Sequence, residues 1–119
     1  MLFRSLRQLA VIQLAKGNLD VAENFVRISI DLAEKEKERG LLLVGLSSRV
    51  LGDILAKSGD LATAISSYES ALNIFLKIEN MLEARKTGEF LAQVYLSSDD
   101  SERMRNLVNT LHTYNITLG

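Results

Sequence analysis

The residues that could do chemistry in this sequence are few and scattered. His112 is the only histidine and the chain has no cysteine, so the usual ligand sets for zinc are missing. Asp99, Asp100 and Glu102 could form a cation site, but carboxylates in the first turn of a helix more often cap it and interact with its dipole. The sequence shows neither a histidine paired with a nucleophile nor a glycine-rich phosphate loop. We therefore expect no enzyme, no cofactor and no metal site.

The composition excludes further classes of function. The chain has 119 residues, no proline and a net charge of −1, which fits one all-helical domain and gives no field that attracts nucleic acid. Arg4 and Arg7 interrupt the N-terminal apolar run, so no secretory signal is evident. The most apolar stretch, residues 40–48, is far shorter than the ~20 residues that span a bilayer. We expect a cytoplasmic protein without nucleic-acid or membrane partners.

The elements that must position any site are repeated along the chain. Residues 17–22 return as residues 59–64, displaced by 42 positions (59 − 17). A fainter third copy follows 40 positions later, where Leu91 and Ala92 match Leu51 and Gly52. A repeat of this length indicates a stack of similar helical units. The first displacement also relates five further pairs, Ser5 and Ser47, Arg7 and Arg49, Leu9 and Leu51, Ile12 and Ile54, and Lys35 and Lys77.

Helical periodicity predicts six helices in three pairs. Gly17 and Gly59 are expected to supply left-handed turns, and Gly40 to end the second helix after a run of alternating charges. Asn80 with Glu83, and Asp99 with Glu102, have the spacing of capping boxes that open the fifth and sixth helices. Short connections predict that consecutive helices lie antiparallel. The predicted helices cover residues 2–16, 19–39, 41–57, 61–78, 81–96 and 100–116.

The second repeat, with Leu51-Gly52, Gly59-Asp60 and Ala71-Leu72, resembles the tetratricopeptide repeat. The resemblance implies an all-α, right-handed α-α solenoid of three helix pairs in one domain, residues 1–119, with repeats at about 2–39, 41–79 and 81–118. The displacements of 42 and 40 exceed the usual period of about 34 and are similar to those of kinesin light chains and bacterial regulators. The positions that match the family's structural pattern are Gly17, Ala22, Leu51, Gly52, Gly59, Ala64, Tyr68, Ala71, Ala92 and Tyr95.

In this family the first helix of each pair lines a concave face on which peptides dock. The resemblance assigns to that face Arg4, Arg7, Val11, Arg49, Asp53, Lys57, Lys86, Glu89 and Gln93. Five cations against two carboxylates would favour an acidic peptide or a free C-terminal carboxylate. The alternative interpretation is that these residues are solvated polar positions of the helices.

The function that this pattern favours is a protein- or peptide-binding scaffold within a larger protein or complex. Two alternatives remain: a self-assembling structural element, and a peptide-sensing regulatory domain that would need an attached output domain. The first helix carries Val11, Ile12 and Leu14 outside its main stripe, which predicts an interface there with upstream chain or a second copy. The sixth helix is expected to be a capping element with one apolar stripe, formed by Met104, Leu107, Val108, Leu111 and Tyr114.

Overall fold

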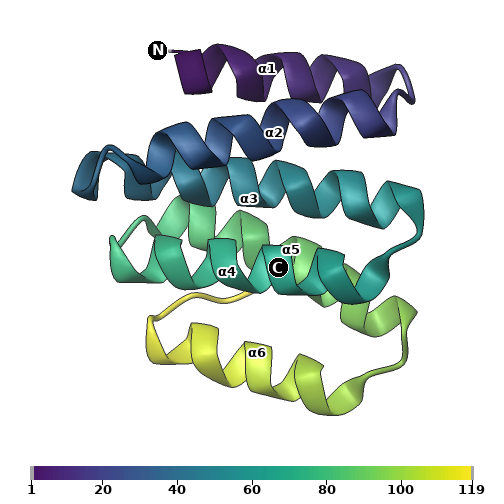
Figure 1. Ribbon diagram of the computed structural model, residues 1–119. Coiled ribbons are helices and arrows are strands. Elements are labelled where there is room, and N and C mark those ends of the chain that lie inside the picture. Colours follow the sequence, from purple (N-terminus) through teal and green to yellow (C-terminus); the bar gives the residue numbers. More distant parts are fainter. Residues whose placement is uncertain (1, 119) are drawn as a thin grey trace.

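The computed structural model describes residues 2–118, apart from the side chains of residues 2–4 and 38, and this part contains six helices and no strand. Consecutive helices run in opposite directions in one stack, 36 × 32 × 19 Å in extent (Figure 1). Each helix packs against the next one in the chain, and α1 also contacts α3. The predicted all-α stack is confirmed. The helices are α1 (Leu2–Ala15), α2 (Leu19–Glu34), α3 (Glu38–Ser58), α4 (Leu61–Lys77), α5 (Met81–Ser97) and α6 (Ser101–Thr113).

Left-handed residues mark the ends of the helices. The backbone φ is +82° at Gly17 and +92° at Gly59, which confirms the two predicted turns. Asp99, with a φ of +57°, stands 40 positions after Gly59 and makes the same turn without glycine. The other non-glycine residues with positive φ are Lys37, Glu79 and Asn115.

Among the described residues, no helix is long and apolar enough to cross a lipid bilayer.

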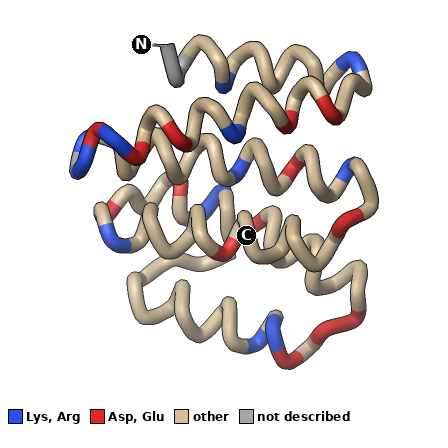
Figure 2. Tube along the Cα trace, viewed as in Figure 1, with Lys and Arg blue, Asp and Glu red and all other residues tan. Residues whose placement is uncertain are grey.

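The turn between α2 and α3 differs from the prediction. The second helix does not extend to Arg39, because α2 ends at Glu34 and α3 begins at Glu38. Gly40 lies inside α3 rather than ending α2. A Cβ atom on Gly40 would come within 1.8 Å of the carbonyl oxygen of Ala33, so this position needs glycine for the close approach of the two helices. The alternating charges of residues 34–39 gather around this turn, at the left of Figure 2.

The helix caps confirm one predicted position and shift another. The side chain of Asn80 accepts a hydrogen bond from the backbone N–H of Glu83 at 3.2 Å, as a cap of α5 should. At α6 the cap is Asp100, which accepts from the N–H of Arg103 at 3.1 Å, so the predicted pairing of Asp99 with Glu102 is wrong by one residue. The reason is that Asp99 is used for the left-handed turn.

Small residues lie where the helices approach most closely. Ala64 and Ala71 of α4 are fully buried, and Gly52 of α3 faces the ring of Tyr68, also in α4. A Cβ atom on Gly52 would lie 2.7 Å from that ring. The pairing of a small residue on one helix with a large one on its neighbour sets the distance between α3 and α4.

The two ends of the stack differ in part from the prediction. In α6, Leu107 and Leu111 are buried but Val108 is exposed, and Tyr114, directly after the helix, is exposed as well, so the apolar stripe is narrower than expected. The helix ends at Thr113 rather than Ile116, and the following chain folds back so that Ile116 is buried. In α1, Leu14 packs against the core, whereas Val11 and Ile12 are exposed. Leu14 therefore does not belong to an exposed second face.

Candidate functional site

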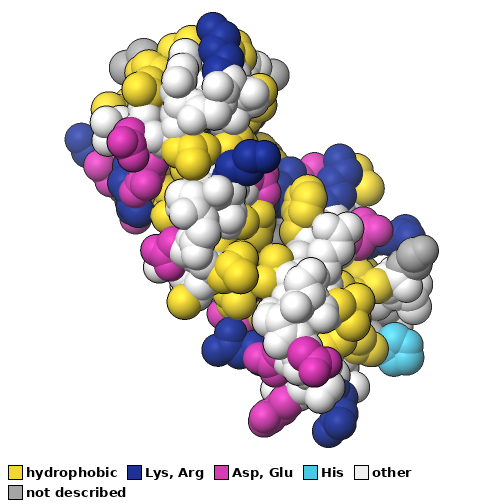
Figure 3. All heavy atoms as spheres, turned by 90° about the vertical axis from the view of Figure 1, so that its right-hand side faces the viewer, with side chains coloured by type: hydrophobic (Ala, Val, Ile, Leu, Met, Phe, Trp, Pro, Cys, Tyr) yellow, Lys and Arg dark blue, Asp and Glu magenta, His cyan; other side chains and the backbone are white. Residues whose placement is uncertain are grey.

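A hollow between α3 and α5 collects most of the residues predicted to line a groove. Its volume is about 430 Å³, and it opens to solvent between the lobe of the first helix pair and that of the third (Figure 3). Because α3 and α5 are the first helices of successive pairs, equivalent positions in the repeat meet across this hollow. It is lined by Arg49, Val50, Asp53, Lys86, Glu89, Phe90 and Gln93, and five of these seven are residues predicted from the sequence.

The remaining predicted residues lie beside this hollow. Lys57 lines an adjacent depression of about 470 Å³, which Asp53 shares with the turn between α1 and α2. Val11 is exposed on α1 and Arg7 is half-buried on the same helix. The side chain of Arg4 lies outside the described residues. We call the surface formed by the hollow and this depression the inner groove.

Arg49 is bound to its neighbours rather than free in the groove. Its Nη2 lies 2.6 Å from a carboxylate oxygen of Glu83, and both side chains are largely buried. Its Nη1 donates to the Thr87 hydroxyl at 3.3 Å, and its guanidinium lies 5.5 Å from the centre of the Phe75 ring. The charge of Arg49 is therefore neutralised by Glu83, and the side chain ties α3 to α5. Sequence reasoning placed Glu83 only in a helix cap and missed this partner.

Asp53 also has an internal partner, the hydroxyl group of Tyr68, which donates a hydrogen bond to its carboxylate. Burial raises the pKa of Asp53 above its ordinary value, although the hydrogen bond and the nearby charge of Arg49 act in the opposite direction. The pKa of Tyr68 is raised as well, because burial and the adjacent carboxylate disfavour the phenolate. The pair links the floor of the groove to α4.

An aromatic side chain forms the apolar part of the groove. Phe90 is 39% exposed, and its ring stacks on the buried ring of Tyr68 with the centroids 5.9 Å apart and an angle of 18° between the planes. Val50 lines the same hollow from α3. Phe90 and Val50 are equivalent in the repeat, 40 positions apart, and this register could have identified them from the sequence. The predicted groove did not include either residue.

Among the described side chains of the groove, charges of both signs are exposed. Lys57 and Lys86 are exposed cations, and Glu89 is an exposed carboxylate. The ammonium group of Lys86 lies 3.7 Å from Glu83, an exposed contact that contributes little to stability. With Arg49 paired to Glu83, the groove offers two exposed lysines around an aromatic surface.

The other groups considered in the sequence do not converge. His112 is exposed on α6, and Asp100 serves as the cap of that helix. Within residues 2–118, apart from the side chains that are not described, no three His, Asp or Glu residues come together as a metal site would require.

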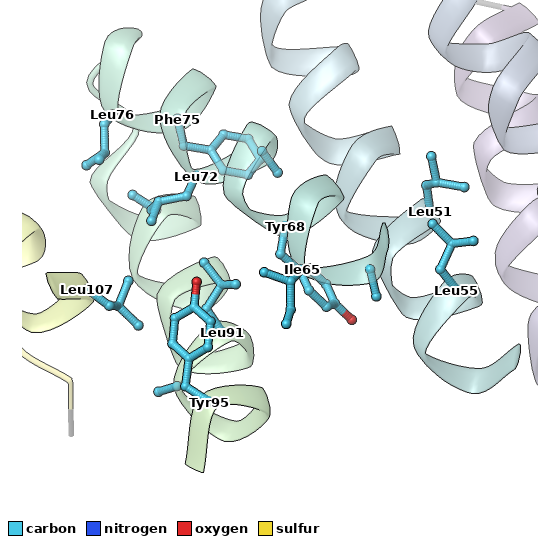
Figure 4. Close-up of a cluster of buried hydrophobic side chains, with 14 of the residues drawn as sticks. Leu51, Leu55, Ile65, Tyr68, Leu72, Phe75, Leu76, Leu91, Tyr95 and Leu107 are labelled. Atoms are coloured by element: carbon cyan, nitrogen blue, oxygen red, sulfur yellow. The ribbon is translucent and has the colours of Figure 1, made fainter. Parts of the chain in front are cut away.

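A second hollow, of about 370 Å³, lies between α4 and α6 on the other side of α5. The Tyr95 hydroxyl donates to the Glu69 carboxylate at 2.7 Å, and burial together with this carboxylate raises the pKa of Tyr95. Leu72, Leu91 and Leu107 meet near Tyr95 from the three helices (Figure 4). The hollow is lined by Glu69, Leu72 and Asn73 of α4, Leu91 and Tyr95 of α5, and Arg103, Asn106, Leu107 and Thr110 of α6.

Comparison with known proteins identifies the repeat. The family model described as Tetratricopeptide repeat matches residues 2–77, which is more than half of the chain. Neither the curated proteins nor the solved structures gave a match.

Proposed function

Since this chain belongs to the tetratricopeptide repeat family, whose members generally mediate protein–protein interactions, we propose that its inner groove binds a peptide segment of a partner protein. The segment would place an apolar side chain on Phe90 and Val50 and a carboxylate near Lys86 or Lys57. The observation that carries this proposal is the exposed ring of Phe90, held in place by the buried ring of Tyr68.

Several features support binding without a large rearrangement. The ring of Phe90 is fixed by stacking, and the hydroxyl of Tyr68 is fixed in turn by Asp53. Arg49 and Glu83 hold α3 and α5 together at the floor. A surface that is already ordered loses little conformational entropy when a ligand binds. Exposed lysines at its edge would attract an acidic segment, and salt would weaken that attraction.

A peptide-display library, selected on the 119-residue chain, tests the proposal. We expect the selected peptides to combine an aliphatic or aromatic residue with Asp or Glu. Their affinity should fall by about tenfold or more with Phe90→Ala, as for an anchor residue of an interface. Lys86→Glu should weaken binding mainly at low salt.

Leu96→Ala is the matched control, because Leu96 is an exposed apolar residue of the same helix that does not line the inner groove. It should leave binding unchanged. Peptides that bind Phe90→Ala and Lys86→Glu as tightly as the natural chain would refute the assignment of the groove.

A further inference from the structure

The first helix pair exposes apolar side chains at positions that are covered in the later pairs. Leu9 of α1 is 41% exposed, but its equivalents Leu51 and Leu91 are 7% and 0% exposed. Ile12 is 49% exposed, but its equivalent Ile54 is only 1% exposed. In α3 and α5 these positions are covered because the preceding helix, α2 or α4, packs over them. In the stack of helices that the structure describes, α1 lies at one end (Figure 1).

Apolar side chains of α2 are exposed as well. Val21 and Ile28 are 44% and 49% exposed, and Phe25 lies between them, only partly buried. A displacement of 82 positions (91 − 9) carries these three residues onto Arg103, Leu107 and Thr110 of α6. Those three residues, together with Leu91, face α4 across the second hollow.

The repeat therefore places residues of α1 and α2 on one surface, in the position from which α5 and α6 face α4. We call this surface the end face, formed by Leu9, Ile12, Val21, Phe25 and Ile28. Hydrophobic side chains are exposed on the lobe of the first helix pair, at the top of Figure 3. An apolar surface of this kind on a folded domain marks an interaction site.

From this register we infer that the end face docks one amphipathic helix of a partner protein, placed as α4 lies against α5 and faces α6 across the second hollow. The helix would carry an apolar stripe like that of α4, with basic side chains beside it. The basic side chains are favoured by the charge of α2, which carries four carboxylates and a single cation. That cation, Arg27, is already paired with Glu23 at 2.7 Å, whereas the carboxylates of Asp20 and Asp31 are exposed beside the end face.

A second copy of the chain fits this surface poorly. The opposite end of the stack presents Arg105, Val108 and His112, all exposed, so a head-to-tail contact would bury a charge and an imidazole against apolar side chains. A face-to-face contact would bring the carboxylates of both α2 helices together, with like-charge repulsion. The end face and the inner groove share none of their lining residues, so the two proposals stand or fall separately.

A tethered helix tests the inference on the full chain. Residues 59–83, which contain α4 and the turn after it, are duplicated directly before Leu2. Because residue 84 is equivalent to residue 2, the copied helix then connects to α1 through the same turn that connects α4 to α5. We expect the amides of the copied helix to exchange with deuterium at least about tenfold more slowly than in the same extended chain carrying Ile12→Lys and Ile28→Lys. Leu96→Lys, at an exposed apolar residue away from the end face, should not change the protection.

A charge substitution in the copied helix tests whether basic side chains are favoured beside the end face. In its natural position Glu69 accepts a hydrogen bond from Tyr95 and lines the second hollow with Arg103. The displacement of 82 positions replaces Arg103 by Val21 and puts Asp20 in the place of Glu102, so the copied Glu69 loses the neighbouring cation while the acidic residue next to it remains. Replacing only the copied residue, Glu69→Lys, should therefore increase the protection further. High salt, or Asp20→Asn in the same extended chain, should reduce this gain.

Two results would overturn the inference. The first is a copied helix that exchanges as fast as an unfolded peptide both with and without the lysine substitutions of the end face. The second is a natural chain that sediments as a dimer and becomes a monomer with Ile12→Lys, which would assign the end face to self-association.

Discussion

Gly52→Ala should destabilise the chain, although alanine is the better helix former. The added Cβ atom would lie 2.7 to 3.0 Å from three ring atoms of Tyr68, closer than such contacts normally are. The ring has little room to move, because it is buried, stacks on Phe90 and is hydrogen-bonded to Asp53. Overpacking of this kind costs about 1–3 kcal/mol. The higher helix propensity of alanine returns about 1 kcal/mol, so we expect a net loss of up to about 2 kcal/mol.

The repeat itself supplies the control. At the equivalent positions the first repeat pairs Ala10 with Val26, and both residues are fully buried. In a Tyr68→Val background, Gly52→Ala should therefore stabilise the chain by about 1 kcal/mol, reversing its sign. Gly88→Ala should be nearly neutral, because its Cβ would meet chiefly a methyl group at the flexible end of Leu111. Urea unfolding followed by circular dichroism gives all the free energies. A stabilising effect of Gly52→Ala in the natural background would refute the reasoning.

Three further changes test the interior of the molecule. Asp53→Asn should raise the free energy of unfolding at neutral pH, because the raised pKa of Asp53 means that stability falls as pH rises through that pKa. The gain should disappear below about pH 4, where the carboxylate is protonated in both the folded and the unfolded state. A pH series of urea unfolding checks this. Arg49→Ala should cost about 3 kcal/mol because it leaves Glu83 largely buried with only the exposed Lys86 as a neighbouring cation, and a double-mutant cycle with Glu83→Ala should show that the two losses are not additive. Gly40→Ala should lower the thermal midpoint strongly, because its Cβ would collide with the backbone of Ala33, and an unchanged midpoint would contradict the described crossing of α2 and α3.

Much of the fold could be predicted because its determinants are local and repeated. Gly17 and Gly59 mark left-handed turns, and Asn80 marks a helix start, through chemistry that acts within a few residues. The same local rules failed where two elements competed for one residue. Asp99 was predicted as a cap, but it makes the turn and leaves the cap to Asp100. Gly40 was predicted as a helix end, but the close approach of two helices uses it instead.

The sequence by itself determined the period of the repeat, the six helices and the set of residues on the first helix of each pair. The partner of each charged side chain was decided only by the tertiary structure, because such partners come from helices far apart in the chain and depend on how the helices cross. The sequence predicted Arg49 as an available cation of the groove, but Glu83 neutralises it. Asp53 likewise accepts a hydrogen bond from Tyr68. The repeat register can place Phe90 in the groove, but only the packing of α4 against α5 places a second ring beneath it.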